Sequence, residues 1–136
     1  MSQNPQLTPE VLLNYSPYAR LIGMKLDVIE GELRFSLPFQ QDNIGNDQLP
    51  ALHGGLIGGF MEMAAIMHLL WIREGNAVPR TVDFSIDYLR PGLARELFAS
   101  CSVTKHGQQI ANVQVCVWQE SADKPVAVAR AHFLLD

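Results

Sequence analysis

The sequence lacks several features that define common classes of protein. It holds only two cysteines, Cys101 and Cys116, which are too few for a disulfide scaffold and are not spaced for zinc. We therefore expect two reduced thiols and a reducing compartment, the cytoplasm. Lysine and arginine number 10 against 14 acidic residues, and no basic run is present, so no nucleic-acid partner is expected. Residues 1–20 show neither the basic leader nor the apolar segment of a secretion signal.

Long apolar runs are scarce as well, and residues 54–72 form the one clear example. This run could just span a bilayer, since a membrane helix needs roughly 20 apolar residues. However, Glu62 stands near its midpoint, glycines cluster in its first half, and the strands that follow need a helix to cover their apolar face. We therefore predict no membrane partner. The expected organisation is a single domain over 1–136, with residues 1–20 as an N-terminal helix and lead-in.

The rest of the chain reads mainly as strands. Apolar and polar residues alternate through 80–90, which is typical of a half-buried strand. Further strands are predicted at 24–29, 32–37, 97–103, 111–117 and 126–135, with a loop at 38–50. Thr8, Pro9 and Glu10 predict a short helix that ends near Ser16-Pro17. Consecutive strands tend to pair antiparallel, and a helix that is apolar on nearly every side must be surrounded. The predicted fold class is α+β, with a curved antiparallel sheet of about six strands wrapped around one long helix.

Glu62 is the one charged side chain between Gly54 and Ile72. Burying a carboxylate costs free energy unless the group is paired, protonated or used. One interpretation is a structural salt bridge with Arg34 or Arg80. The other is a general base or nucleophile, because apolar surroundings strip the carboxylate of its hydration.

Two motifs give the sequence a family resemblance. His53-Gly54-Gly55 is followed by an acid nine positions after the histidine, Glu62, and residues 81–92 read TVDFSIDYLRPG. Together they resemble the hotdog-fold acyl-CoA thioesterases of the phenylacetate-degradation (PaaI) type, over roughly residues 20–135. The resemblance implies hydrolysis of acyl-coenzyme A without a metal or other cofactor, coenzyme A being part of the substrate. It also implies a homodimer, often paired further into a homotetramer.

The resemblance and the residue chemistry together suggest roles at the start of the helix. Free backbone N–H groups there carry partial positive charge, so Gly55, and after it Gly54, would donate to the oxyanion of the reacting thioester. His53 would orient the preceding loop. The family's asparagine before this motif corresponds to Asn43 or to Asn46, and the connection from either to His53 is longer than usual.

Helix geometry limits where these groups can act together. Nine residues of helix rise about 13 Å, so the glycines and Glu62 of one chain cannot hold the same thioester. Two antiparallel central helices from different subunits would bring the glycines of one chain to the glutamate of the other. Gly58 and Gly59 would then allow the close approach. Thr81 matches a family hydroxyl residue that helps hold the attacking water, although it could equally be an ordinary strand residue.

Coenzyme A carries phosphates, so an acidic chain needs local positive charge to bind it. The candidates are Arg90 at the end of a strand and Lys105, His106 and Gly107 in a turn. Two other functions remain open. A hydroxyacyl-thioester dehydratase would use a histidine from the loop before the helix, and residues 39–51 contain none. A non-catalytic acyl-CoA-binding module would not need Glu62.

Overall fold

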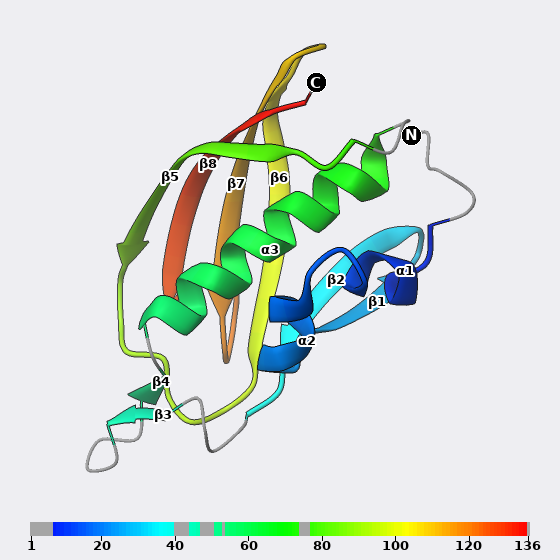
Figure 1. The fold of residues 1–136 in the computed structure, drawn as a ribbon. Helices are drawn as coiled ribbons and strands as arrows, with labels where there is room; N and C mark the ends of the chain where they lie inside the picture. The colour runs from blue at the N-terminus through cyan, green and yellow to red at the C-terminus, as the bar shows by residue number, and fades with distance from the viewer. Residues whose placement is uncertain (1–6, 40–43, 47–50, 53, 74–76, 136) are drawn as a thin grey trace.

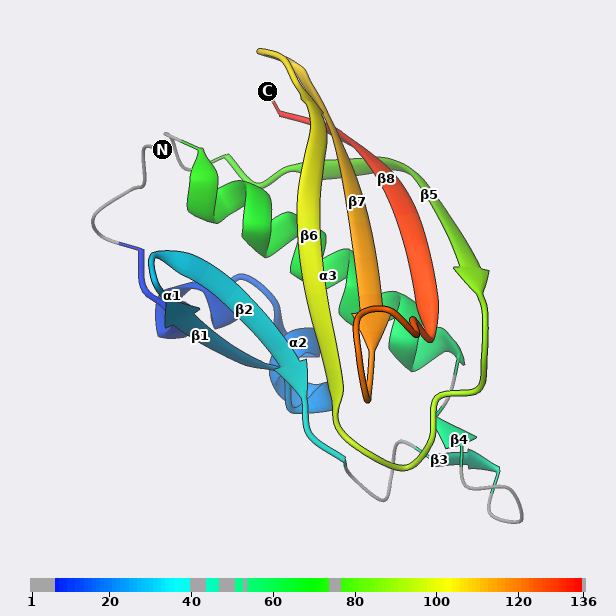
Figure 2. The same cartoon turned by 180° about the vertical axis from the view of Figure 1, so that it is seen from behind.

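The computed structural model describes residues 7–39, 44–46, 51–52, 54–73 and 77–135. Its main sheet has six strands in the order β1-β2-β6-β7-β8-β5, and all neighbouring strands are antiparallel. These strands are β1 (Lys25–Ile29), β2 (Glu32–Leu37), β5 (Arg80–Tyr88), β6 (Leu97–His106), β7 (Ile110–Trp118) and β8 (Ala127–Leu134). The sheet curves around the long helix α3 (Gly54–Ile72), as Figures 1 and 2 show from opposite sides. The predicted α+β hotdog fold is thereby confirmed.

Helix α3 forms the core together with the inner face of the sheet. Phe60 and Met61 are fully buried, and so is Phe133 of β8 opposite them in the same core. The helix is long and apolar enough to cross a membrane, but 56% of that stretch is buried inside the fold. The sheet already covers the apolar surface that lipid would otherwise cover, so α3 is a core helix, as predicted.

Two short helices precede the sheet. α1 (Pro9–Leu13) begins as predicted, because the hydroxyl oxygen of Thr8 accepts a first-turn backbone N–H at 3.2 Å. Ser16-Pro17 was predicted to end this helix, but it also begins a second one, α2 (Pro17–Ile22), which Ser16 caps. Proline disfavours helix in the residue before it yet suits the first helical position, so one proline serves as a stop and a start.

Part of the predicted loop at 38–50 belongs to a second, small sheet. β3 (Ile44–Asn46) pairs antiparallel with β4 (Ala51–Leu52) directly before α3. The N–H of Leu52 donates to the carbonyl of Gly92 at 2.8 Å. This bond ties the approach to α3 to the connection that follows β5, so the start of the helix and the end of β5 are held together.

β5 lies at an edge of the main sheet, beside β8 rather than beside β6. Strands 80–90 and 97–103 were expected to pair as consecutive strands, but the connection 89–96 crosses the end of the sheet (Figure 1). Among the described residues, no strand pairs with the outer edge of β5. A nine-residue strand therefore presents unpaired backbone groups.

Candidate active site

Glu62 lies in the middle of α3, on the side of the helix that the sheet leaves partly uncovered. Its side chain is half-buried, and its Oε2 accepts a hydrogen bond from Thr81 Oγ1 of β5 at 2.8 Å. The alternative of a salt bridge between Glu62 and Arg34 is wrong, because Arg34 pairs with Glu32 at 3.6 Å. The structure thus brings together two residues of the predicted site that are 19 positions apart in the sequence.

A β-bulge explains how Thr81 reaches the helix. Strict alternation along β5 would place Thr81 and Phe84 on opposite faces of the sheet, since three positions separate them. Instead the register slips at Val82, and Thr81 pairs with Phe133, a core residue. Residues directly opposite one another in antiparallel strands point to the same face, so Thr81 points toward α3. Val82 was predicted to point inward, but as the extra residue of the bulge it is 61% exposed.

The uncovered side of α3 carries Gly55 as well as Glu62. Seven residues separate the two, which is nearly two full turns, so both project from the same side of the helix about 10 Å apart along its axis. A methyl group placed on Gly55 would meet no other atom within 4 Å. The first turn is therefore open to a ligand. Within one subunit, however, the Gly55 amide and the Glu62 carboxylate lie too far apart to contact the same carbonyl group.

Tyr88 stands at the start of α3 and was not predicted as a site residue. It ends β5, and its hydroxyl donates to the carbonyl oxygen of Gly54 at 2.6 Å. A β-carbon placed on Gly54 or on Gly58 would lie 3.5 Å from the Tyr88 hydroxyl oxygen, so the side chain also covers this turn of the helix. Alternation along β5 correctly indicated that Tyr88 points inward, but no local pattern indicates its bond to the helix.

Gly58 and Gly59 make room for side chains of their own subunit. Tyr88 covers Gly58, and a β-carbon placed on Gly59 would lie 2.5 Å from the hydroxyl oxygen of Tyr18 in α2. The predicted reason for these two glycines, the close approach of a second helix, stays a prediction. Within one chain, packing requires glycine at position 59, whereas a β-carbon on Gly58 would make only ordinary van der Waals contacts.

Two residues of the predicted site, His53 and Asn43, lie outside the described residues, so their roles stay predictions. Asn46, the alternative to Asn43, belongs to β3 and pairs with Ala51 in the short hairpin before α3.

The predicted coenzyme A residues fall at two ends of the sheet. Arg90 lines a hollow of about 350 Å³ beside the start of α3, together with Gly54, Ile57 and Tyr88. Residues 105–107 lie at the turn between β6 and β7, at the opposite end (Figure 1). The nine residues of β5 alone span about 30 Å. One subunit therefore does not bring the two groups together.

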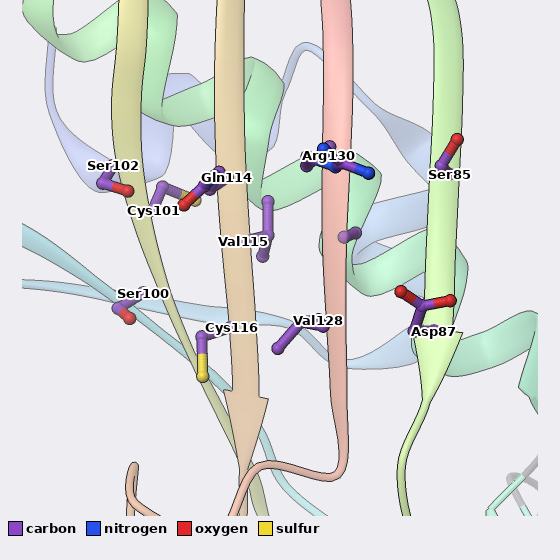
Figure 3. Close-up of a pocket in the computed structure, with 11 residues that line it drawn as sticks. Ser85, Asp87, Ser100, Cys101, Ser102, Gln114, Val115, Cys116, Val128 and Arg130 are labelled. Atoms are coloured by element: carbon purple, nitrogen blue, oxygen red, sulfur yellow. The ribbon is translucent and has the colours of Figure 1, made fainter.

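A second hollow, of about 390 Å³, lies on the outer face of the sheet, away from α3. Figure 3 shows its lining side chains, which come from four strands and include Ser85, Asp87, Gln114 and Arg130. It contains neither Glu62 nor the amides of the helix start. Because the carboxylate and the open amides are on α3, we place the candidate active site there although this hollow is the larger one.

The two cysteines are free and lie on the neighbouring strands β6 and β7. Cys101 pairs with Val115 and Cys116 pairs with Ser100, so the thiols are one position out of step and point to opposite faces of the sheet. Burial raises the pKa of both thiols. Neither is a ready nucleophile, because the thiolate is the reactive form.

The two histidines in the described parts of α3 and β8 do not approach Glu62. His68 lines a small hollow with Glu32 and Trp71, and burial lowers its pKa while the charge of Glu32 opposes that shift. His132 Nδ1 lies 3.4 Å from Asp83 Oδ2. Within the described ranges, no three histidine, cysteine or acidic side chains are grouped so that they could hold a metal ion.

Known proteins are similar to this chain in sequence and in fold. The model of the thioesterase superfamily matches residues 49–126, more than half of the chain. A curated relative, the medium/long-chain acyl-CoA thioesterase YigI of Escherichia coli strain K12, is 27% identical over 124 residues, covering 81% of this chain and 80% of that protein. A solved structure from Chromobacterium violaceum is 53% identical with a TM-score of 0.77, covering 94% of this chain and 89% of that one. A phenylacetic acid degradation-related protein from Ralstonia eutropha JMP134 has the same fold, with 21% identity and a TM-score of 0.77 over 93% of this chain and 97% of that one.

The region that matches the family model contains the start of α3, Glu62, Thr81 and Tyr88. It also contains β5, β6 and β7, three of the six strands of the curved sheet. The chain therefore belongs to the thioesterase superfamily and is a thioester hydrolase.

Proposed function

We propose that this protein hydrolyses acyl-coenzyme A to a free acid and coenzyme A, in the manner of the phenylacetate-degradation type. The observation that carries this proposal is the hydrogen bond from Thr81 to Glu62, on the uncovered side of α3. A carboxylate held by one donor at one oxygen keeps its other oxygen for a water molecule or for the thioester carbon. The fixed geometry favours attack on a carbonyl group placed beside it.

In the proposed reaction Glu62 is either the general base or the nucleophile. As a base, it removes a proton from a water molecule held near Thr81, and the water oxygen attacks the thioester carbon. The resulting oxyanion accepts hydrogen bonds from the amides of Gly55 and Gly54. The C–S bond then breaks, and the coenzyme A sulfur takes up the proton. As a nucleophile, Glu62 would first attack the thioester carbon and form an anhydride with the acyl group, and the C–S bond would break to release coenzyme A as its thiolate. Water would then hydrolyse the anhydride to the free acid and restore the Glu62 carboxylate, and the thiolate would take up the proton that this step releases.

The reacting groups come from two subunits in this proposal. Thr81 lies near the start of β5 and Tyr88 at its end, and the outer edge of β5 is unpaired in the described chain. If two copies of β5 pair antiparallel about a two-fold axis, the start of one strand lies beside the end of the other. Glu62 and Thr81 of one subunit then lie near the partner subunit's Gly55. The homodimer has two such sites, and a further pairing into a tetramer remains a prediction.

The same pairing of two β5 strands would also bring together the coenzyme A residues that one subunit keeps apart. The partner's turn 105–107 would lie at the end of the joint sheet that holds Arg90, because the two strands run in opposite directions. We propose that Arg90, together with Lys105, His106 and Gly107 contributed by the other subunit, binds the phosphates of coenzyme A.

For the acyl group we propose medium and long chains. Met63 and Ile66 flank Glu62 on α3 and are only partly buried, which leaves apolar surface for an alkyl chain. The name of the E. coli relative supports the same chain lengths. The two free thiols on opposite faces of the sheet support a reducing compartment, and we propose the cytoplasm.

Release of free thiol from a panel of acyl-CoA esters, from acetyl to palmitoyl and including phenylacetyl, tests the proposed function. We expect turnover that rises with chain length, and its loss in Glu62→Gln. Formation of an enoyl product from a hydroxyacyl ester without thiol release would show a dehydratase instead. Tight binding of the whole panel with no turnover of any ester would show a binding module.

A further inference from the structure

We infer that Tyr88 is a positioning residue that orients and polarises the amide of Gly55, the principal oxyanion donor. This inference rests on the proposed function. The carbonyl of Gly54 and the N–H of Gly55 belong to one planar peptide group. The Tyr88 hydroxyl donates to that carbonyl at 2.6 Å. The contact at one end of the peptide therefore acts on the donor at its other end.

Two physical effects follow from a donor at the Gly54 carbonyl. First, the bond adds to the restraint that the helix places on the plane of this first-turn peptide, and so on the direction in which the Gly55 N–H points. Second, hydrogen bonds in a chain polarise one another, so a donor at the oxygen makes the N–H of the same peptide a stronger donor. The N–H groups of a first helical turn have no acceptor within the helix. The increased donor strength of the Gly55 N–H is therefore available to a ligand on the open side of Gly55.

The structure holds Tyr88 firmly from the sheet side. Its neighbour Leu89 donates its N–H to the carbonyl of Val126 at 2.8 Å, which anchors the end of β5. On the helix side, the Tyr88 hydroxyl lies against the first turns of α3, where a β-carbon on Gly54 or Gly58 would be in ordinary van der Waals contact with its oxygen, at 3.5 Å. A phenylalanine would fill the same space. Packing alone therefore does not require the hydroxyl group.

The exposure of Tyr88 leaves its hydroxyl little role in the stability of the fold. Tyr88 is 51% exposed, and a hydrogen bond at the surface contributes little to folding because water replaces it. Loss of the hydroxyl should therefore leave the fold intact and change the chemistry. A role in packing alone would give the opposite result.

The test compares Tyr88→Phe with a matched control, Tyr18→Phe. Tyr18 also rests on a glycine of α3, Gly59, and is 38% exposed. With a medium-chain acyl-CoA, we expect Tyr88→Phe to lower kcat roughly tenfold, less than the loss of a whole oxyanion donor, while KM changes less than about twofold. Tyr18→Phe should leave both values unchanged.

A spectroscopic measurement reports on the amide directly. The probe is an acyl-CoA analogue in which a methylene group replaces the thioester sulfur, so the bound carbonyl is not hydrolysed. Difference infrared spectroscopy measures its stretching frequency, which falls as hydrogen bonds to the oxygen strengthen. We expect a smaller fall in Tyr88→Phe than in the wild type and in Tyr18→Phe. Tyr88→3-fluorotyrosine, a stronger donor of the same shape, should give a larger fall and covers the case in which Tyr88→Phe does not fold.

The outcomes separate this inference from the proposed function. If the wild-type protein releases no thiol, the proposed function fails and this inference falls with it. If the wild type is active and Glu62→Gln is inactive, but Tyr88→Phe has the kcat and the carbonyl frequency of the wild type, this inference alone is overturned. A lower kcat with an unchanged frequency overturns it too, because Tyr88 would then act on some other group.

Discussion

Thr81 donates its hydroxyl to Glu62 across 2.8 Å, from an edge strand to the central helix. The contact depends on the bulge at Val82, which turns Thr81 toward α3 while Phe84 stays in the core. Without the extra residue, threonine would face the outer surface. Bulges redirect side chains in this way at the edges of sheets and beside active sites.

The first prediction concerns Glu62. Glu62→Gln keeps the size of the side chain and can still accept from Thr81, so the protein should fold and bind acyl-CoA. It cannot take up a proton or attack carbon, so turnover should fall about 10³-fold. Thiol release measures the turnover, and isothermal titration with a thioether analogue measures binding. Glu120→Gln is the control, because Glu120 is a surface partner of Arg95. Normal turnover in Glu62→Gln would exclude this carboxylate from the chemistry.

The second prediction separates the hydroxyl of Thr81 from its shape. Thr81→Val is nearly isosteric but lacks the donor to Glu62, and kcat should fall roughly tenfold, in keeping with the loss of a hydrogen bond to a charged group. Thr81→Ser retains the hydroxyl and should keep most of the activity. Equal rates for the valine and serine variants would show that Thr81 is only a strand residue.

The third prediction tests the shared site. Gly55→Pro removes the amide hydrogen in the first helical turn, where proline is tolerated, and should abolish turnover. Gly55→Ala keeps the hydrogen and adds a methyl group with no atom within 4 Å, so it should stay active. Mixing Gly55→Pro subunits with Glu62→Gln subunits should restore part of the activity, because one site of each hybrid dimer has both intact groups. Subunit exchange without any restored activity would mean that each site lies within one chain.

The fourth prediction places the dimer contact at β5. Val82 is 61% exposed at the bulge of this unpaired edge strand. Val82→Lys should shift the protein to monomers and abolish activity, because a lysine on an edge strand opposes pairing with a second strand. Val28→Lys is the matched control, since Val28 is 43% exposed on β1, the opposite edge of the sheet. Size-exclusion chromatography with light scattering measures the mass, and an active monomer or a dimer that tolerates Val82→Lys would contradict the proposed arrangement.

The fifth prediction concerns stability and pH. Burial lowers the pKa of His68, with the charge of Glu32 opposing part of the shift, so the folded protein binds this proton less readily than the unfolded chain does. As the pH falls below the ordinary value of 6.5, the unfolded chain gains the proton first and the free energy of unfolding decreases. Above that pH, the contribution of His68 to the free energy of unfolding is fully present. One proton accounts for at most about 1.4 kcal/mol per pH unit.

Urea unfolding between pH 7.5 and 5.5 checks this linkage. The free energy of unfolding of the wild-type protein should decline with falling pH more steeply than that of His68→Gln, which does not titrate. Parallel curves for the two proteins would show that His68 is not the group responsible.

Periodicity predicted most of the fold because apolar residues alternate along the strands and occupy nearly all positions of α3. The strands of the β6–β7–β8 meander and the core helix depend on local patterns that the chain shows directly. The edge position of β5 does not, because it depends on how the connection 89–96 crosses the sheet. The second helix was missed because Ser16-Pro17 reads equally as an end and as a beginning.

The candidate site was predictable only in part, for a similar reason. Glu62 and Gly55 stand out by composition and by the family motif. The pairing of Thr81 with Glu62 needs the bulge, and a single extra residue in a strand leaves no periodic signal. Tyr88 depends on the distance between the end of β5 and the first turn of α3, which only the folded chain sets.

The unpaired edge of β5 also has a consequence for the life of a newly made chain. In the proposed dimer a second copy would cover this edge, along which no described strand pairs. Before that pairing, the edge could recruit an extended segment nearby, so an isolated subunit would be open to misassembly. Finding the correct neighbour would then serve as protection as well as completing the catalytic unit. Changes along this edge would lower the yield of usable protein before any defect in chemistry could be measured.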